Sequence, residues 1–287
     1  MSTPTSSTRP TSTLSDPDRE DPVINFTSTQ ALFKAINSVS GDVLFVRNVS
    51  PESFTKIEKT RTTRRRKIRW CRYDAEAQLL VIAIPTGVHE TLHLELYYSG
   101  YVPQLVAMGR LWHAWRSMGA TYFRSNHPGG AGGGVEADSS GGPKPQRLGR
   151  GHWPTLAIEA GETESLDQLR ADMRWWFSSS NHDVKIVLLA KFDRRQSQII
   201  LEKWEEQAAT RQGATTTRLA ATPQPVLQQA ITITREATTP VSYSVTGGAL
   251  LLEFRLLFLR DPDPPESDVV MSVEFLQEYA DMVWCQV

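Results

Sequence analysis

A strand–helix–strand pattern constrains the fold of this 287-residue chain most strongly. An apolar segment at residues 155–160 ends at Gly161 and reads as a strand. A helical pattern begins near Ser165, which with Gln168 three residues later forms the sequence signature of a capping box. A nearly continuous apolar run follows at 184–190, as expected for a strand that is buried on both faces. Short connections between these elements predict a right-handed crossover between two parallel strands.

Further periodic segments surround this unit. We expect helices at residues 29–39, 86–98 and 271–284, the last with a cap near Ser272. Gly100 and Pro103 interrupt the second of these helices, and a further helix then runs to about residue 118. We expect strands at residues 42–49, 67–74, 78–85, 198–204, 231–235 and 249–259. Strands and helices in this order predict an α/β or α+β fold, in which helices flank a mixed central sheet.

Composition divides the chain into a tail and one folded domain. Residues 1–22 contain ten Ser or Thr and four Pro residues, so this segment buries too little apolar surface to fold and is expected to be disordered. Residues 23–287 form the expected domain. It carries a flexible loop at 126–151, which holds nine of the eighteen glycines, and a polar insertion at 206–225.

Several protein classes are excluded by simple counts. No apolar run approaches the roughly 18–20 residues that a membrane span needs, and the N-terminus is rich in Ser, Thr and Pro rather than apolar. Two cysteines, Cys71 and Cys285, form neither a disulfide framework nor a cysteine-based zinc site. We therefore expect an intracellular protein, nuclear or cytoplasmic, that is neither secreted nor bound in a membrane.

The charge is balanced overall but unevenly placed. Residues 56–72 contain nine basic side chains and one acidic one, which leaves a net charge of −9 on the remainder of a chain whose total is −1. Such a segment attracts phosphates and also fits a nuclear-import signal, whereas its plainest interpretation is a solvated edge strand. The residues that we expect to contact nucleic acid are Arg64, Arg65, Arg66, Lys67 and Arg69.

One short motif suggests zinc chemistry. His89, Glu90 and His93 form an HExxH string in a predicted helix, where positions four apart lie on one face. Two imidazoles with an intervening glutamate are the arrangement of zinc proteases. No third ligand is evident, because His113 lies beyond Gly100 and Pro103. Ordinary helix histidines are the other interpretation.

A second constellation consists of carboxylates. Glu159 lies within the apolar strand at 155–160, and Asp138 lies in the glycine-rich loop before it. A buried acid is costly unless it is paired or binds a metal. Lys185, one residue into the next apolar run, allows both outcomes: it forms a buried ion pair with Glu159, or it stands near a phosphate while Asp138 and Glu159 hold Mg²⁺ or Mn²⁺.

The ordered motifs resemble a group of fungal proteins with a restriction-endonuclease-like core of the PD-(D/E)XK type. The resemblance covers residues 67–284 and is carried by the segments at 85–93, 136–140, 153–172, 175–176, 184–189, 200–204 and 258–260. In that superfamily a helix acid, a strand-borne aspartate and a Glu-x-Lys pair surround the metal. The resemblance implies Glu90, Asp138 and Glu159 for the three acids. Gly161 occupies the usual lysine position, so Lys185 is the substitute.

The resemblance thus implies a divalent-metal-dependent nuclease that hydrolyses DNA phosphodiester bonds, or a protein derived from one. A catalytically inactive module that binds nucleic acid or protein on the same fold is the alternative, and an HExxH zinc protease is the third hypothesis.

Overall fold

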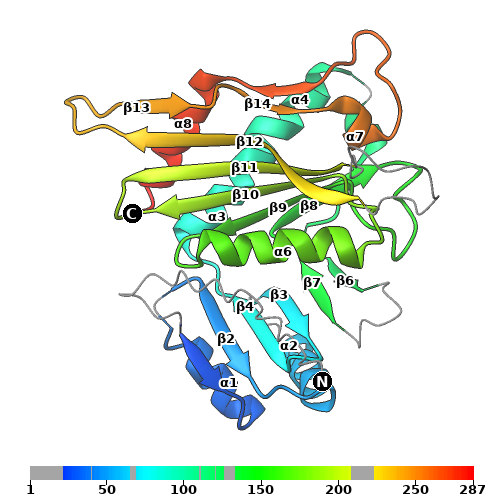
Figure 1. Ribbon diagram of the computed structural model, residues 1–287, viewed down its shortest axis with the longest axis vertical. Coiled ribbons are helices and arrows are strands. Elements are labelled where there is room, and N and C mark those ends of the chain that lie inside the picture. The colour runs from blue at the N-terminus through cyan, green and yellow to red at the C-terminus, as the bar shows by residue number, and fades with distance from the viewer. Residues whose placement is uncertain are drawn as a thin grey trace, which may run out of the picture.

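The computed structural model describes residues 22–39, 41–64, 69–109, 111–119, 121–125, 133–207 and 223–287. Their strands form a seven-stranded sheet, a six-stranded sheet and a two-stranded ribbon. In Figure 1 the seven-stranded sheet lies above the six-stranded one, and helix α6 runs between them.

The larger sheet contains the strand pair predicted from the sequence. Its strands, in spatial order, are β13 (Tyr243–Thr246), β12 (Gln224–Arg235), β11 (Gln198–Gln207), β10 (Ile186–Asp193), β9 (Leu156–Gly161), β8 (Ser139–Pro143) and β5 (Trp115–Ser117). Strands β9 and β10 are parallel, as predicted, and every other neighbouring pair is antiparallel. The sheet is therefore mixed.

Helices cover both faces of this sheet. Helix α6 (Leu166–Ser179) packs on one face, and α3 (Gly87–Leu94) and α8 (Val273–Trp284) pack on the other. The alternation along β9 follows from this: Ile158 belongs to the core under α3 and α8, whereas Ala157 belongs to the core under α6. The capping box at Ser165 and Gln168 is present.

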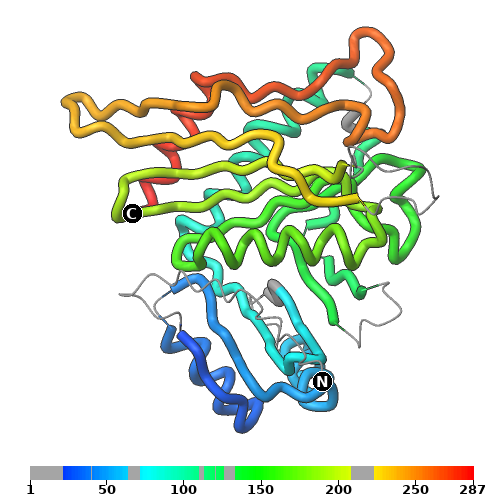
Figure 2. Tube along the Cα trace, viewed as in Figure 1, coloured from blue at the N-terminus to red at the C-terminus, as the bar shows by residue number. Residues whose placement is uncertain are grey.

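The smaller sheet combines two distant parts of the chain. Its strands, in spatial order, are β1 (Val23–Asn25), β2 (Val43–Arg47), β4 (Leu79–Ala83), β3 (Arg69–Asp74), β7 (Gly134–Glu136) and β6 (Tyr122–Arg124), and its helices are α1 (Thr29–Ile36) and α2 (Pro51–Arg64). Figure 2 shows the blue and cyan N-terminal strands continued at one edge by the green strand β7. Two residues then lead from β7 in this sheet to β8 in the other.

The segment after α3 differs from the prediction. Helical backbone continues without a break through the π-helix η1 (Glu95–Tyr101) and α4 (Val102–Ala107), across Gly100 and Pro103. A Cβ at Gly100 would lie 2.8 Å from Met271 Sδ and from the Phe275 ring, so this glycine serves close packing. Pro103 lies in the first turn of α4, where the π-helix gives way to the α-helix. After the short helix α5 (Leu111–Ala114), the expected helix is replaced by strand β5.

Two further segments correct the prediction. The glycine-rich stretch contains the buried strands β7 and β8, because Gly141 leaves room for the Trp115 indole, whose Nε1 would lie 2.5 Å from an added Cβ. The strand expected at 249–259 is β14 (Leu250–Leu252) followed by α7 (Phe254–Phe258), and β14 pairs with β15 (Val269–Met271). The expected disordered tail falls outside the described residues except for its last position, as does most of the polar insertion.

The predicted fold class is confirmed: a mixed α+β fold with a mixed central sheet flanked by helices. None of the helices in the described parts of the chain is both long enough and apolar enough to span a bilayer.

Candidate metal centre

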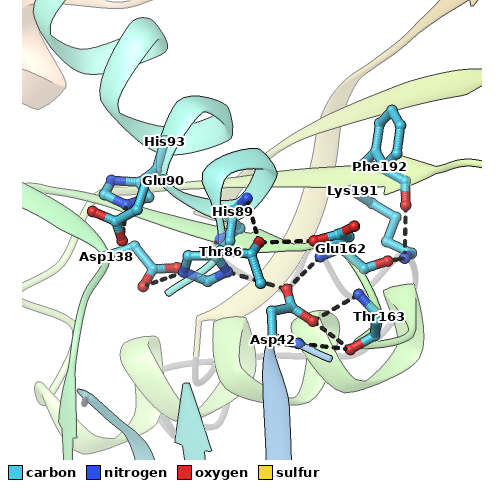
Figure 3. Close-up of polar contacts among 11 residues, drawn as sticks. Asp42, Thr86, His89, Glu90, His93, Asp138, Glu162, Thr163, Lys191 and Phe192 are labelled. Carbon is cyan, nitrogen blue, oxygen red and sulfur yellow. Dashed lines mark hydrogen bonds and ion pairs between the residues drawn. The ribbon is translucent and has the colours of Figure 1, made fainter. Parts of the chain in front are cut away.

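The candidate site lies where the two sheets meet, at the first turns of α3 (Figure 3). Asp138 is one of the two residues that connect β7 with β8, and Asp42 directly precedes β2. Thr86 caps α3: its hydroxyl accepts the His89 backbone N–H at 3.1 Å and donates to Glu162 Oε2 at 2.7 Å. The start of α3 is thereby fixed to the turn that follows β9.

The two histidines of the HExxH string are buried and oriented by second partners. His89 is 2% exposed and His93 is fully buried. The Nδ1 atom of His89 lies 3.1 Å from Asp42 Oδ2, and that of His93 lies 2.9 Å from Ser139 Oγ. A hydrogen bond at one ring nitrogen fixes the ring orientation and leaves the other nitrogen to bind, as is general for metal-binding histidines.

The remaining ring nitrogens face carboxylates. His89 Nε2 lies 3.1 Å from Asp138 Oδ1, and His93 Nε2 lies 3.4 Å from Glu90 Oε1. One ligand atom from each of His89, Glu90 and His93 lies within 4.8 Å of the others. We refer to His89, Glu90, His93 and Asp138 as the His–carboxylate centre. Glu90 is its accessible member, with 32% of its side chain exposed.

Asp42 holds the centre to the neighbouring turn. Its carboxylate accepts hydrogen bonds from the backbone N–H of Glu162 at 2.5 Å and of Thr163 at 2.7 Å, and from the Thr163 hydroxyl. Burial by itself raises the pKa of Asp42, but the bonds from His89, Thr163 and Glu162 hold it below its ordinary value. Burial lowers the pKa of His89, yet the carboxylates of Asp138 and Asp42 raise it well above its ordinary value.

More buried acids adjoin the centre on the α6 side. Glu159 accepts a 2.5 Å hydrogen bond from Trp176 Nε1, and its pKa is raised well above the ordinary value by burial and then by Asp138 and Asp172. Burial and Asp172 likewise raise the pKa of Glu164. The pKa of Asp172 is raised to about 6 by burial, against the attraction of Arg72, whose guanidinium lies 2.9 Å away.

These residues fit a divalent cation. His89 Nε2 contacts Asp138 and His93 Nε2 contacts Glu90, so a cation held by the cluster of His89, Glu90 and His93 would replace contacts of this kind while Asp42 and Ser139 keep the rings in place. A cation would also favour the ionised form of Glu159, which burial and the neighbouring acids disfavour. Asp138 is fixed in addition by the Ala160 backbone N–H, which donates to Oδ2 at 2.9 Å.

The structure places Glu90 and Asp138 each against one histidine of α3 and Glu159 across from Asp138, but it does not bring Lys185 to the site. The register of β8 with β9, continued by one residue, sets Asp138 across from Glu159, and each affects the other electrostatically. Lys185 precedes β10, whereas Leu189 is the residue opposite Glu159, so Lys185 lies about 13 Å away along the strand. Its ammonium donates to the His182 carbonyl at 2.6 Å instead.

A different lysine takes the position expected for the Glu-x-Lys pair. Lys191 on β10 lies opposite Gly161, two residues after Glu159. Its ammonium donates to the carbonyl oxygens of Glu162 at 2.6 Å and Phe192 at 2.9 Å. Burial lowers the pKa of Lys191, and Asp42 is the first of the acids that oppose this shift. Lys191 therefore supports the turn that Asp42 also holds.

The predicted nucleic-acid contacts are only partly described. Arg65, Arg66 and Lys67 lie outside the described residues, Arg64 ends α2, and Arg69 begins β3. Two neighbouring arginines of the basic segment form internal ion pairs: Arg61 makes two hydrogen bonds to Glu136, and Arg72 pairs with Asp172. These two stabilise the junction between α2, the smaller sheet and α6.

Asp42, Ser139 and Lys191 were not predicted as site residues. Asp42 carried one signal, a lone acid immediately before an apolar strand. Lys191 carried another, since it directly follows the apolar run 184–190. Both signals depend on pairing between distant segments, which the local pattern does not give.

No protein-family model and no curated protein sequence matches this chain. A solved structure with a similar fold is that of a candidate nuclease of DUF820 from Anabaena variabilis, at 10% sequence identity and a TM-score of 0.40, over 73% of this chain and 90% of that chain.

Proposed function

We propose that this protein is a divalent-metal-dependent hydrolase of nucleic-acid phosphodiester bonds, with DNA as the substrate. The observation that carries the proposal is the cluster of His89, Glu90 and His93, with Asp138 against His89 Nε2 and with Asp42 and Ser139 fixing the imidazoles from behind. Histidines on an ordinary exposed helix face would not be buried with two polar partners each. The resemblance of residues 67–284 to PD-(D/E)XK-type proteins supports the phosphodiester class.

The donor set favours Mn²⁺ or Zn²⁺ over Mg²⁺. Imidazole suits transition metals, whereas Mg²⁺ prefers oxygen ligands and keeps several waters. Glu90, Asp138, His89 and His93 would hold the cation, and Glu159 is a neighbouring carboxyl group. Such a cation polarises a phosphate and lowers the pKa of water.

The chain's own residues supply position and charge. Glu90 is partly exposed, so it lies on the side from which a substrate approaches. Asp42 and Thr86 fix α3 against the turn after β9. Lys191 anchors the same turn through the Glu162 carbonyl and adds a positive charge near the acids. Lys191 is thus a positioning residue in this proposal, whereas Lys185, which was expected near the phosphate, has no role in it.

The first test is metal binding by His93→Gln beside His113→Gln. His113 is an exposed histidine on α5 and serves as the matched control. Titration calorimetry with Mn²⁺ and with Zn²⁺ is expected to show one site in the wild type and in the control, and none in His93→Gln. Plasmid and single-stranded DNA are expected to be cleaved with Mn²⁺ by the wild type and by the control, but not by His93→Gln. If His93→Gln still binds Mn²⁺ or Zn²⁺, or if both Glu90→Gln and Asp138→Asn still do, the His–carboxylate centre is not the metal site.

A peptide hydrolase is the second candidate, because His89, Glu90 and His93 keep the HExxH arrangement on one face of α3. The same purified protein distinguishes the two. Hydrolysis of an unfolded protein substrate by the Zn²⁺ form, without DNA cleavage by the Mn²⁺ form, selects the peptidase. Metal binding without either activity selects the catalytically inactive module.

A further inference from the structure

A basic cavity lies apart from the His–carboxylate centre, near the start of β9. It has a volume of about 520 Å³ and is formed by β5, β6 and the segment 148–153. Phe123 and Trp153 contribute to its lining and are almost fully buried in the core under α6. This volume falls within the ordinary range of ligand pockets, about 300–1,000 Å³.

The polar part of the lining is cationic. Arg116, Arg124, Arg150 and His152 line the cavity, and none of the described lining residues is acidic. Arg124 and Arg150 are exposed, so their charges are available to a ligand, and the exposed His152 ring lies beside them. Arg124 lies near Glu58 of α2. Burial raises the pKa of Glu58, and the positive charge of Arg124 opposes this rise. The cavity is therefore next to the helix on which the predicted basic segment begins.

The wall at residues 147–152 is held in place before any ligand arrives. Arg116 Nη1 donates to the Leu148 carbonyl at 2.8 Å, and Arg147 Nη2 donates to Asp183 Oδ1 at 3.0 Å. A Cβ at Gly149 would lie 2.9 Å from the His152 ring, so this glycine allows the ring to fold over the backbone. A preformed wall lowers the entropic cost of binding.

The segment that leads into β9 joins the cavity to the centre. Trp153, which lines the cavity, lies six residues before Glu159 in the chain. The Trp153 and Glu159 side chains both belong to the α6 side of the sheet, where Trp176 contacts each of them. One tryptophan thus contacts both the cavity wall and a carboxyl group beside the centre.

We infer that this cavity binds the phosphate backbone of a nucleic-acid strand whose continuation reaches the His–carboxylate centre. The inference rests on the proposed function for its substrate, but the binding itself requires no metal. Arginines that contact phosphates give sequence-independent affinity that falls with salt, because each contact releases counterions. Arg124 and Arg150 are the residues that carry this affinity, whereas Arg116 also supports the wall.

The experiment measures binding of a fluorescent single-stranded DNA of about 16 nucleotides by anisotropy, over a range of NaCl concentrations and with EDTA present. EDTA removes divalent cations, so cleavage cannot change the signal. The variant is the double substitution Arg124→Gln with Arg150→Gln. The control is Arg255→Gln, which removes a charge from an exposed arginine on α7. The urea midpoint of each variant checks that the fold is intact.

We expect weaker binding by the double variant and a slope of log K against log salt that is smaller by about 1.4, at 0.7 per phosphate contact on a single strand. Arg255→Gln is expected to bind like the wild type. An unchanged slope in the double variant overturns the inference, and so does an equal loss in Arg255→Gln. If the double variant shows the expected loss while wild type with Mn²⁺ cuts no DNA, the proposed hydrolase fails and the binding cavity stands.

Discussion

Replacement of Asp42 by asparagine tests the link between the smaller sheet and the metal centre. The Asp42 carboxylate faces four donors: His89 Nδ1, the Glu162 N–H, and the N–H and hydroxyl of Thr163. The asparagine side chain keeps one acceptor oxygen, but it loses the charge and places an N–H group toward two of these donors. Asp42 is 2% exposed, so water cannot replace the lost partner. Two hydrogen bonds to a charged group, at about 1.5–3 kcal/mol each, give a loss of about 3–6 kcal/mol. Breaking a buried ion pair from one side costs about 3–5 kcal/mol.

The assay is urea unfolding of the metal-free protein, monitored by tryptophan fluorescence and by circular dichroism to verify a single transition. We expect Asp42→Asn to lower the free energy of unfolding by about 3–5 kcal/mol. Asp261→Asn, an exposed aspartate in a surface loop, is the control and is expected to stay within about 0.5 kcal/mol of the wild type.

A double-mutant cycle with His89→Gln isolates the pair itself, since residues in direct contact couple by about 0.5–3 kcal/mol. Asp42→Asn is also expected to weaken Mn²⁺ affinity by about 10–100-fold, because Asp42 orients a ligand rather than binding the metal. A free-energy change below about 1 kcal/mol, together with unaltered Mn²⁺ affinity, would refute the claim that Asp42 supports the centre.

Three further predictions concern the surroundings of the centre. The folded-state pKa of Asp172 is raised to about 6, so its stabilising contribution is complete below the unfolded pKa of about 3.9 and is lost as pH rises through 6. The difference in unfolding free energy between wild type and Asp172→Asn should therefore fall by about 3 kcal/mol over that range. A difference that does not change with pH contradicts the raised pKa. Lys191→Met should destabilise the protein by about 1–3 kcal/mol, since two carbonyl oxygens lose a charged donor. Lys185→Met should leave the Mn²⁺ affinity unchanged in calorimetry, and a loss of affinity in this variant would restore Lys185 to the site. Gly141→Ala should cost about 1–3 kcal/mol because its Cβ meets the Trp115 indole, while Gly87→Ala, which meets the flexible Gln286 side chain, serves as the control in the same urea assay.

Local sequence patterns predicted the parts of the fold whose information is local. The capping box at Ser165, the apolar strands β9 and β10 and the closing helix α8 were all predicted, because propensity and periodicity act over a few residues. The same reasoning failed at Gly100 and in the glycine-rich stretch. There, glycine predicts a break or a loop, whereas in the structure it allows the close approach of Phe275 to Gly100 and of Trp115 to Gly141.

The site shows the same division. Glu90 and Asp138 could be selected from the sequence, and the HExxH string already put His89 and His93 on one helix face. What the sequence left open was whether a nuclease-like acid set or a histidine set would form. In the structure the connection between β7 and β8 sets Asp138 against His89, and Ser139 at the start of β8 lies behind His93.

The lysine illustrates why tertiary structure had to decide the remainder. Lys185 and Lys191 lie at the two ends of one apolar run, and nothing in the run itself distinguishes them. The register of β10 on β9 puts Lys191 opposite Gly161 and Lys185 at the far end. A strand register depends on contacts between segments about 30 residues apart in the chain. The sequence by itself therefore determined which elements form and which side chains carry charge. Only the pairing of those elements decided which charges meet, because a buried charge is stabilised by the partners that the folded chain brings to it.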